Sequence, residues 1–184
     1  YGLEFDGATG YVAFGSPAKL DIVNALSIDF WIVPYSVGTT MHVLGWSAAG
    51  AIPFRVFVDT TGHLNLSWTK ATATVTKTTA FAMVAGQRYH FGITLSDTAV
   101  TFYPYTYASN LVTVPEVFTG TGFTGRDAGS GAFRYGVTFG GANFFDGQLW
   151  SVRIRSTTDA RSTIEERRWR PTTAAEEADT SLEQ

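Results

Sequence analysis

Four aspartates at expected turns are the residues whose type and placement suit metal chemistry. Loop carboxylates and backbone carbonyls are the oxygen ligands that calcium prefers in proteins. Aspartate is also favoured at turns because its side chain hydrogen-bonds to the nearby backbone, so a structural role explains the same positions. No Asp-x-Asp spacing separates these alternatives, and no cofactor other than calcium is suggested. The candidate metal ligands are Asp59, Asp97, Asp127 and Asp146.

Aromatic side chains are the candidate ligand-binding residues, because a flat ring gives a sugar a face on which to stack. Tyr103, Tyr105 and Tyr107 recur at every second position, the period that places residues on one face of a β-strand. Trp46 is a further candidate. The alternative is that these rings fill the core or a subunit contact. Burial is the favoured alternative for the tryptophan, whereas both alternatives stay open for the tyrosines.

Residues for nucleophilic catalysis do not form a recognisable pattern. The serine hydrolase motif Gly-x-Ser-x-Gly is absent, and Ser130 lies between two glycines in an expected loop. His42, His63 and His90 lack the i, i+2 or i, i+4 spacing that brings two imidazoles to one metal ion. We therefore expect a protein that is not an enzyme.

The composition is typical of a compact β-protein. Its 184 residues suit one domain of the sandwich or barrel type, and 45% of them are hydrophobic. The aromatic fraction of 15% is high, and 19 glycines suit short strands joined by tight turns. A net charge of -3 and a pI near 5.5 give no positive field for nucleic acid binding. Cysteine is absent, and no apolar run reaches the roughly 18 residues of a membrane span.

Period-two patterning predicts the strands that must position these residues. The segment 27–34 is apolar on both faces, which predicts a strand in the middle of a sheet. An Asp-Gly turn between 3–7 and 11–14 predicts a strand pair. Two hairpins are expected, one from 53–59 into 64–68 and one from 88–96 into the strand that begins at Val100.

The remaining segments are expected at the surface or at the ends. Residues 69–79, rich in Thr and Ala, suit an exposed edge strand or loop, and 119–131, with five glycines, suit a long loop at one end of the domain. Ser162 and Glu165 can cap a short helix that ends before Pro171. We expect one domain over 1–170 and an acidic tail or linker over 171–184.

Taken together, several segments resemble laminin-G-like domains of the concanavalin-A-like lectin/glucanase superfamily. Residues 3–7 (LEFDG) with 11–12 (YV), and residues 27–34 (SIDFWIVP), are similar to the first strands of that family. Residues 87–94 (QRYHFGIT) are similar to its Trp-His-Val-Ala-Val-Thr strand, and 145–154 (FDGQLWSVRI) to its closing strand before a short helix. One departure is residues 103–106 (YPYT), where family members often have Tyr-Val-Asp-Gly.

The resemblance covers residues 3–169 and implies an all-β fold. That fold is a two-sheet antiparallel β-sandwich, a jelly roll of concanavalin-A-like type, with one short C-terminal helix. The same fold hosts glucanases whose catalytic strand reads Glu-x-Asp-x-x-Glu. Glu4 and Asp6 match the first two acids, but Thr9 stands where the third would be.

The leading functional hypothesis is a non-enzymatic binding or adhesion module of a larger surface assembly. It would recognise a carbohydrate or protein ligand on a cell surface through end loops and residues 103–107. The alternative is a bacteriophage virion structural protein, a capsid decoration or tail subunit, whose partners are neighbouring subunits. A glycoside hydrolase ranks last. The first two hypotheses imply an extracellular or virion-surface location, and both are compatible with a homo-oligomer.

Overall fold

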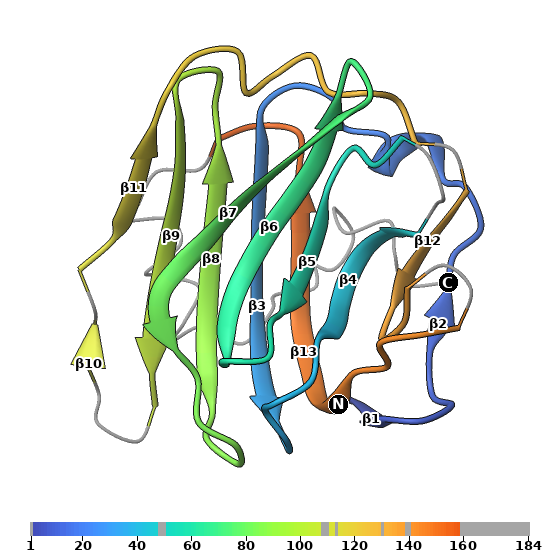
Figure 1. The fold of residues 1–184 in the computed structure, drawn as a ribbon, viewed down its shortest axis with the longest axis vertical. Helices are drawn as coiled ribbons and strands as arrows, with labels where there is room; N and C mark the ends of the chain where they lie inside the picture. Colours follow the sequence, from blue (N-terminus) through green and yellow to red (C-terminus); the bar gives the residue numbers. More distant parts are fainter. Residues whose placement is uncertain are drawn as a thin grey trace.

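The computed structural model describes residues 2–47, 51–107, 111–112, 114–129, 131–138 and 141–158. Within these residues the chain forms two antiparallel sheets packed face to face and one short 3-10 helix, η1 (Ala18–Leu20) (Figure 1). The expected all-β sandwich is thus confirmed. The helix expected near Ser162 and the acidic tail 171–184 lie outside the described residues. In the described part, no helix is long and apolar enough to cross a membrane.

Sheet A has seven strands and sheet B has six. Across sheet A the strands run in the order β1 (Leu3–Asp6), β13 (Asp146–Arg155), β3 (Leu26–Pro34), β8 (Tyr89–Leu95), β9 (Ala99–Thr106) and β10 (Leu111–Val112), and β11 (Glu116–Thr119) also pairs with β9. Across sheet B the order is β2 (Val12–Ala13), β12 (Ala132–Tyr135), β4 (Met41–Ser47), β5 (Arg55–Val58), β6 (His63–Lys70) and β7 (Ala73–Ala82). Sheet B lies in front of sheet A in Figure 1.

Alternate side chains of both sheets fill the space between them. Strand β3 lies between β13 and β8, as predicted for the segment that is apolar on both faces. From sheet B, Phe133 meets several rings at centroid separations between 5.7 and 6.2 Å. Those rings are Phe14, Trp46, Phe54 and Tyr135. Aromatic pairs of this kind contribute about 0.5–1.5 kcal/mol beyond their buried area, so they stabilise the part of the core that sheet B supplies.

Both predicted hairpins are confirmed. Strands β5 and β6 pair from Arg55 opposite Ser67 to Val58 opposite Leu64, and strands β8 and β9 pair along their lengths. The β5–β6 turn needs a glycine, because Gly62 has φ +84° and an added Cβ would lie 2.7 Å from the Met83 carbonyl oxygen.

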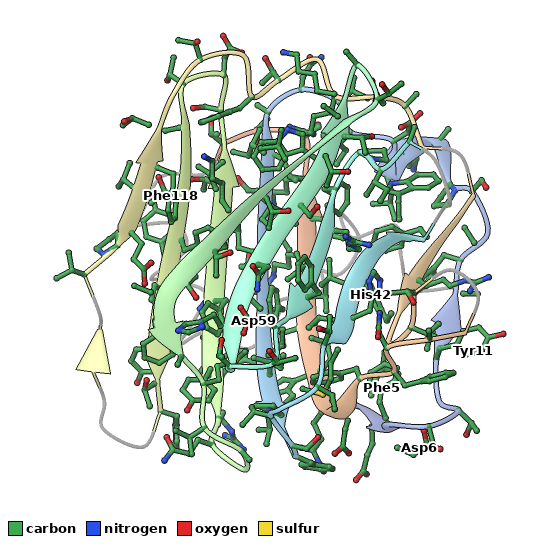
Figure 2. All side chains as sticks on the ribbon, viewed as in Figure 1. Phe5, Asp6, Tyr11, His42, Asp59 and Phe118 are labelled. Atoms are coloured by element: carbon green, nitrogen blue, oxygen red, sulfur yellow. The ribbon has the colours of Figure 1, made fainter. Side chains whose placement is uncertain are left out.

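The first two strands do not pair with each other, and the sequence prediction of a strand pair is wrong. Strand β1 pairs with β13 in sheet A, whereas β2 pairs with β12 in sheet B. The cause is the intervening turn: the Asp6 carboxylate accepts the backbone N–H groups of Ala8, Thr9 and Gly10 at 2.7–2.9 Å. This wide turn carries the chain from Phe5 across to Tyr11 in the other sheet (Figure 2).

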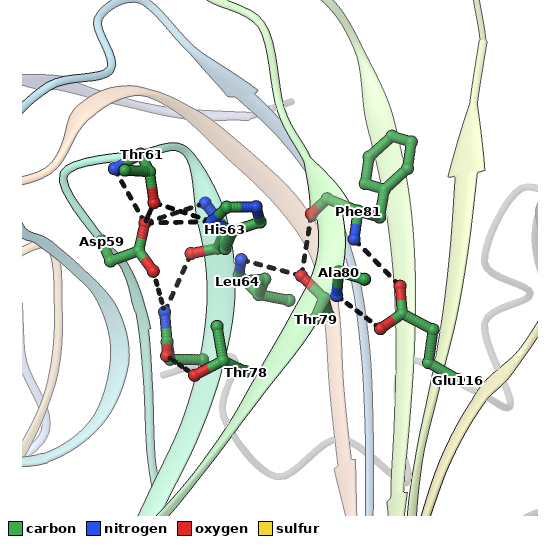
Figure 3. Close-up of polar contacts among 10 residues, drawn as sticks. Asp59, Thr61, His63, Leu64, Thr78, Thr79, Ala80, Phe81 and Glu116 are labelled. Carbon is green, nitrogen blue, oxygen red and sulfur yellow. Dashed lines mark hydrogen bonds and ion pairs between the residues drawn. The ribbon is translucent and has the colours of Figure 1, made fainter.

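A carboxylate links the edges of the two sheets. Strand β7 is the exposed edge strand of sheet B, as expected for residues 69–79. Glu116 of β11, in sheet A, accepts the backbone N–H groups of Ala80 and Phe81 on β7 at 2.5 and 3.0 Å (Figure 3). The Lys77 ammonium lies 5.8 Å from the ring centre of Phe118 on β11. These contacts cover part of an edge that would otherwise offer free N–H groups.

Replacing Glu116 with alanine should lower the free energy of unfolding by about 1–3 kcal/mol, because two backbone N–H groups lose a charged acceptor. In urea titrations the midpoint should fall while the slope is unchanged. Glu116→Gln keeps one carbonyl oxygen and should show a smaller loss. An alanine variant with the wild-type midpoint would show that the link contributes nothing.

Candidate functional site

Two rows of side chains cross the outer face of sheet B from strand to strand. We call the first the Arg55 row; its successive cross-strand partners are Arg134, Gly45, Arg55, Ser67 and Thr76. We call the second the Phe57 row; its partners are His42, Phe57, Asn65 and Thr78. Alternate residues of the same strands, such as Val56 and Leu66, are buried in the core, so the rows face away from it. With strands about 4.8 Å apart, the Arg55 row spans roughly 19 Å.

The rows are built of hydroxyl, amide and guanidinium groups with one aromatic ring. Thr76 Oγ1 donates to Ser67 Oγ at 3.2 Å, and Thr78 Oγ1 donates to Asn65 Oδ1 at 2.5 Å. Asn65 Nδ2 donates in turn to Asp59 Oδ2 at 3.2 Å, so the turn beyond β5 orients the row (Figure 3). Donors and acceptors therefore stand in register across neighbouring strands.

The positive charge of the rows is concentrated around Gly45. Arg55 and Arg134 flank this glycine on β5 and β12, and both side chains are half-buried. The Arg55 guanidinium lies 5.1 Å from the ring centre of Phe57, and that of Arg134 lies 5.4 Å from the ring centre of Tyr11. Burial lowers the pKa of Arg55 from its ordinary value.

His42 is fully buried beside these two arginines. Burial, followed by the positive charge of Arg55, lowers the pKa of its imidazole to about 3. The backbone carbonyls of Arg134 and Gly45 oppose this shift without cancelling it. His42 is therefore neutral at neutral pH and adds no charge to the rows.

The predicted tyrosine ladder lies on the outer face of sheet A, and one end of it is open. Tyr107 is 55% exposed, Tyr103 is half-buried, and Tyr105 is 1% exposed. Trp31 meets Tyr105 and Tyr107 edge-on at 6.1 and 6.4 Å and stacks on Trp150 with 6° between the ring planes. The tyrosines are thus part of a larger aromatic cluster, and Tyr107 is its accessible end.

Charged groups complete this face of sheet A. Arg88 lies over the rings of Tyr107 and Trp150, 5.0 and 5.3 Å from their centres. Deeper in, Arg153 Nη1 contacts Asp29 Oδ1 at 3.1 Å, and both side chains are buried. The Arg153–Asp29 pair is therefore out of reach of a ligand, whereas Arg88 and Tyr107 are exposed and the Trp31 and Trp150 rings are half-buried.

Trp46 lies in the core between the sheets and is 1% exposed. Its indole Nε1 donates to the Leu20 carbonyl oxygen at 2.9 Å, which satisfies its single polar group. It therefore presents no surface on which a ligand can stack. This agrees with burial, the alternative that the sequence analysis favoured for Trp46.

The four candidate metal ligands belong to separate turns. Asp59 accepts hydrogen bonds from the backbone of Thr61 and His63 and from the side chains of Thr61 and Asn65 (Figure 3). Partial burial acts to raise its pKa, but these hydrogen bonds lower it to about 2. Asp146 begins β13, and its backbone carbonyl accepts the Tyr35 N–H.

Asp97 and Asp127 hold the long loop predicted over 119–131. Asp97 accepts the Thr124 hydroxyl at 2.7 Å, and Asp127 accepts the N–H groups of Ala71 and Thr72 at 2.9 and 3.1 Å. Across the described residues, no three His, Cys, Asp or Glu side chains converge as metal ligands do. The sequence-based hypothesis of calcium binding is tested by the melting experiment below.

The two acids that match part of the glucanase pattern also have other partners. Glu4 accepts the Tyr35 hydroxyl at 2.9 Å. Asp6 accepts the Thr9 hydroxyl and three backbone N–H groups, and these hydrogen bonds lower the pKa of its carboxyl. A glycosidase acid needs a raised pKa to hold its proton, so the surroundings of Asp6 favour the opposite form.

Comparison with known proteins identifies the family of this sandwich. A family model, Laminin_G_3, described as the Concanavalin A-like lectin/glucanases superfamily, matches residues 6–164. No curated protein sequence matches the chain.

Solved structures share the fold at low identity. A heptameric SAP-like pentraxin from Limulus polyphemus is 17% identical, with a TM-score of 0.59 over 88% of this chain and 78% of that chain. The enzymatically active domain of tailspike protein 2 of bacteriophage CBA120 is 11% identical, with a TM-score of 0.64 over 90% of this chain and 27% of that chain. Domain 4 of AbnA, an extracellular arabinanase from Geobacillus stearothermophilus, is 18% identical, with a TM-score of 0.55 over 78% of this chain and 66% of that chain. The chain thus spans about a quarter of the tailspike domain.

Acidification should destabilise the protein through His42. Between about pH 6.5 and about pH 3 the unfolded imidazole binds a proton that the folded one does not. The free energy of unfolding should therefore fall with decreasing pH, by at most about 1.4 kcal/mol per pH unit from this group. In urea titrations between about pH 7 and pH 4, His42→Gln should lose less stability than the wild type, and His63→Gln controls for removal of a less buried imidazole. Equal losses in wild type and His42→Gln would contradict the prediction.

Calcium and a chelator should both leave the melting temperature unchanged, because Asp59, Asp97 and Asp127 already accept hydrogen bonds within their turns. Asp97→Asn and Asp127→Asn should lower the melting temperature equally with and without calcium. A calcium-dependent rise that either variant abolishes would instead support a metal site.

Proposed function

Because the chain belongs to the concanavalin A-like lectin/glucanases superfamily, in its laminin-G family, we propose that it is a non-enzymatic binding or adhesion module that recognises a glycan. In this proposal the binding surface is the outer face of sheet B, made of the Arg55 row and the Phe57 row. The module serves a larger assembly outside the cell or on a virion.

The observation that carries the proposal is the arrangement of polar groups in register across the strands of sheet B. The exposed hydroxyls of Thr76 and Thr78 lie in the rows of Arg55 and Phe57. Buried Ser67 and Asn65 accept hydrogen bonds from these two hydroxyls and so orient them. A saccharide presents hydroxyl groups along its length and apolar C–H faces between them, which this combination of groups complements. The opposite face of each strand packs in the core, so the backbone that carries the rows is ordered before a ligand binds. Little conformational entropy of the protein is then lost on binding.

The non-enzymatic part of the proposal is supported by where carboxylates are used. Glycoside hydrolysis requires two carboxyl groups placed on either side of the scissile bond. The two rows contain none, and Asp59, which contacts Asn65 of the Phe57 row, accepts several hydrogen bonds within its own turn. A glycoside hydrolase therefore ranks below a binding module.

One structural relative adds support for a sugar ligand. Domain 4 of the arabinanase was solved in complex with arabinotriose. That complex is a property of the arabinanase domain, and it lends weight to a saccharide ligand here because both chains share the sandwich fold.

A structural role in a virion is the second candidate function. The likeness to the tailspike favours it, as do exposed apolar side chains on and beside β11. Val114 and Val117 are 83% and 57% exposed. Exposed apolar groups of this kind are typical of subunit contacts, where they become buried on assembly. In this candidate the sandwich serves to join neighbouring subunits.

A glycan-array screen of the full chain, with light scattering of the same sample, tests the first proposal. We expect a monomer that binds a defined set of glycans. Thr76→Val and Thr78→Val remove one hydroxyl each while keeping side-chain shape, and each should weaken binding by about fivefold, the equivalent of one neutral hydrogen bond.

Thr119→Val on β11 is the matched control, because it makes the same change outside the rows and should leave glycan binding unchanged. A stable oligomer that binds no glycan would contradict the proposal and favour assembly in a virion.

A further inference from the structure

Arg55 and Arg134 have no acidic partner among the described residues. The described ion pairs involve Asp59 with His63, and Asp29 with His90 and Arg153, and none includes either of these two arginines. The closest polar contact of Arg134 is a long one, from Nη1 to the Thr138 carbonyl oxygen at 3.4 Å. The Nε atoms of all four buried or half-buried arginines, Arg55, Arg126, Arg134 and Arg153, lack a hydrogen-bond partner, so the difference among them lies in the contacts of their Nη atoms.

Two other arginines of the fold have partners that account for their burial. Arg126 is 3% exposed, and its Nη2 donates to the Ile22 and Asn24 carbonyl oxygens at 2.7 and 2.5 Å. Arg153, also buried, contacts Asp29. Because partly desolvated guanidinium groups normally find such acceptors, their absence around Arg55 and Arg134 is a distinguishing feature of this face.

The topology brings these two charges to opposite sides of one glycine. Both arginines are direct cross-strand partners of Gly45, so their Cα atoms are separated by about two strand spacings, roughly 10 Å. Gly45 adopts φ +134°, and a Cβ there would lie 2.6 Å from the Arg55 Cα atom. No side chain of β4 therefore separates the two guanidinium groups at this position.

His42 is buried at the same place. It lies on the same face of β4 as Gly45, on the far side of the irregularity between His42 and Leu44. Both of its ring nitrogens are buried and make no hydrogen bond of normal geometry. The view with side chains shows His42 between β4 and β12, on the side of the strand that carries Arg134 (Figure 2).

We propose that Arg55 and Arg134, with buried His42 packed beside them, form a binding site for an anionic group, a carboxylate or a sulfate ester, on the glycan that sheet B recognises. This inference rests on the proposed function and adds to it the class of ligand, an acidic saccharide. Planar guanidinium groups bind such oxyanions with paired N–H donors, and two of them flanking one position can take one anion from both sides. The exposed hydroxyl of Thr76 continues the Arg55 row and contacts the neutral part of the saccharide.

The test compares charged and uncharged forms of the same saccharide by calorimetry on the full chain. Oligogalacturonate and its methyl-esterified form differ in the carboxylate, and sulfated and desulfated heparin oligosaccharides differ in the sulfate ester. We expect the acidic form of one pair to bind about 10- to 100-fold more tightly than its uncharged form, the range expected for one or two charge-assisted hydrogen bonds. The pair that shows this preference identifies the anionic group.

Arg55→Gln and Arg134→Gln should each weaken binding of the acidic form far more than binding of the uncharged form, and so remove most of that preference. Arg55→Lys keeps the charge but lacks the planar guanidinium with its paired N–H donors, so it should retain part of the preference. Circular dichroism checks that each variant is folded. Arg88→Gln makes the same charge change on sheet A and should bind as the wild type does.

Equal affinity for charged and uncharged forms, or an acidic preference that survives both glutamine variants, would overturn the inference and leave glycan recognition by sheet B intact. Failure to bind any saccharide would overturn the proposed function and this inference together.

Discussion

Strands of both sheets give one face to a common core, and that packing constrains the rest of the molecule. Phe133 illustrates the contact, since its ring touches aromatic side chains that come from the N-terminal segment, β4 and the start of β5. Because side chains alternate across a strand, committing one set to the core fixes the other set on the outer face in rows. The polar rows of sheet B are therefore a direct consequence of how its apolar residues are buried.

Charged side chains in the fold divide into two groups according to their partners. One group stabilises the chain itself: Asp6, Asp59 and Asp127 accept N–H groups in turns, and Glu116 links the sheet edges. The hydrogen bonds that these aspartates accept also keep their pKa values low. The other group consists of Arg55 and Arg134. Their guanidinium groups lie near aromatic rings and have no acidic partner among the described residues. The first group explains the fold, and the second suggests what the fold binds.

Family membership by itself leaves the activity of the chain open. The same sandwich occurs in a pentraxin, a phage tailspike and a domain of an arabinanase, so function has to be argued from particular faces and residues. On sheet A the aromatic cluster around Trp31 is mostly closed, with Tyr107 as its accessible end. On sheet B the rows cross several strands and contain two half-buried arginines that have no acidic partner among the described residues.

The sequence by itself determined the features that depend on neighbours along the chain. The period of two predicted the strand over 27–34 and the β5–β6 and β8–β9 hairpins, because a hairpin pairs residues that a short turn brings together. The same local reasoning failed for β1 and β2. An Asp-Gly pair predicts a tight turn, but here the Asp6 carboxylate accepts three backbone N–H groups and forms a wider turn.

Tertiary structure alone decided which distant residues share a surface. Cross-strand pairing places Arg134, Gly45 and Arg55 side by side although they come from separate parts of the chain, and no local pattern encodes that adjacency. It likewise buried Tyr105 and left Tyr107 exposed, although both occupy the same face of one strand by sequence period. Burial depends on what lies across and over a strand, which is a property of the assembled sheets rather than of the segment.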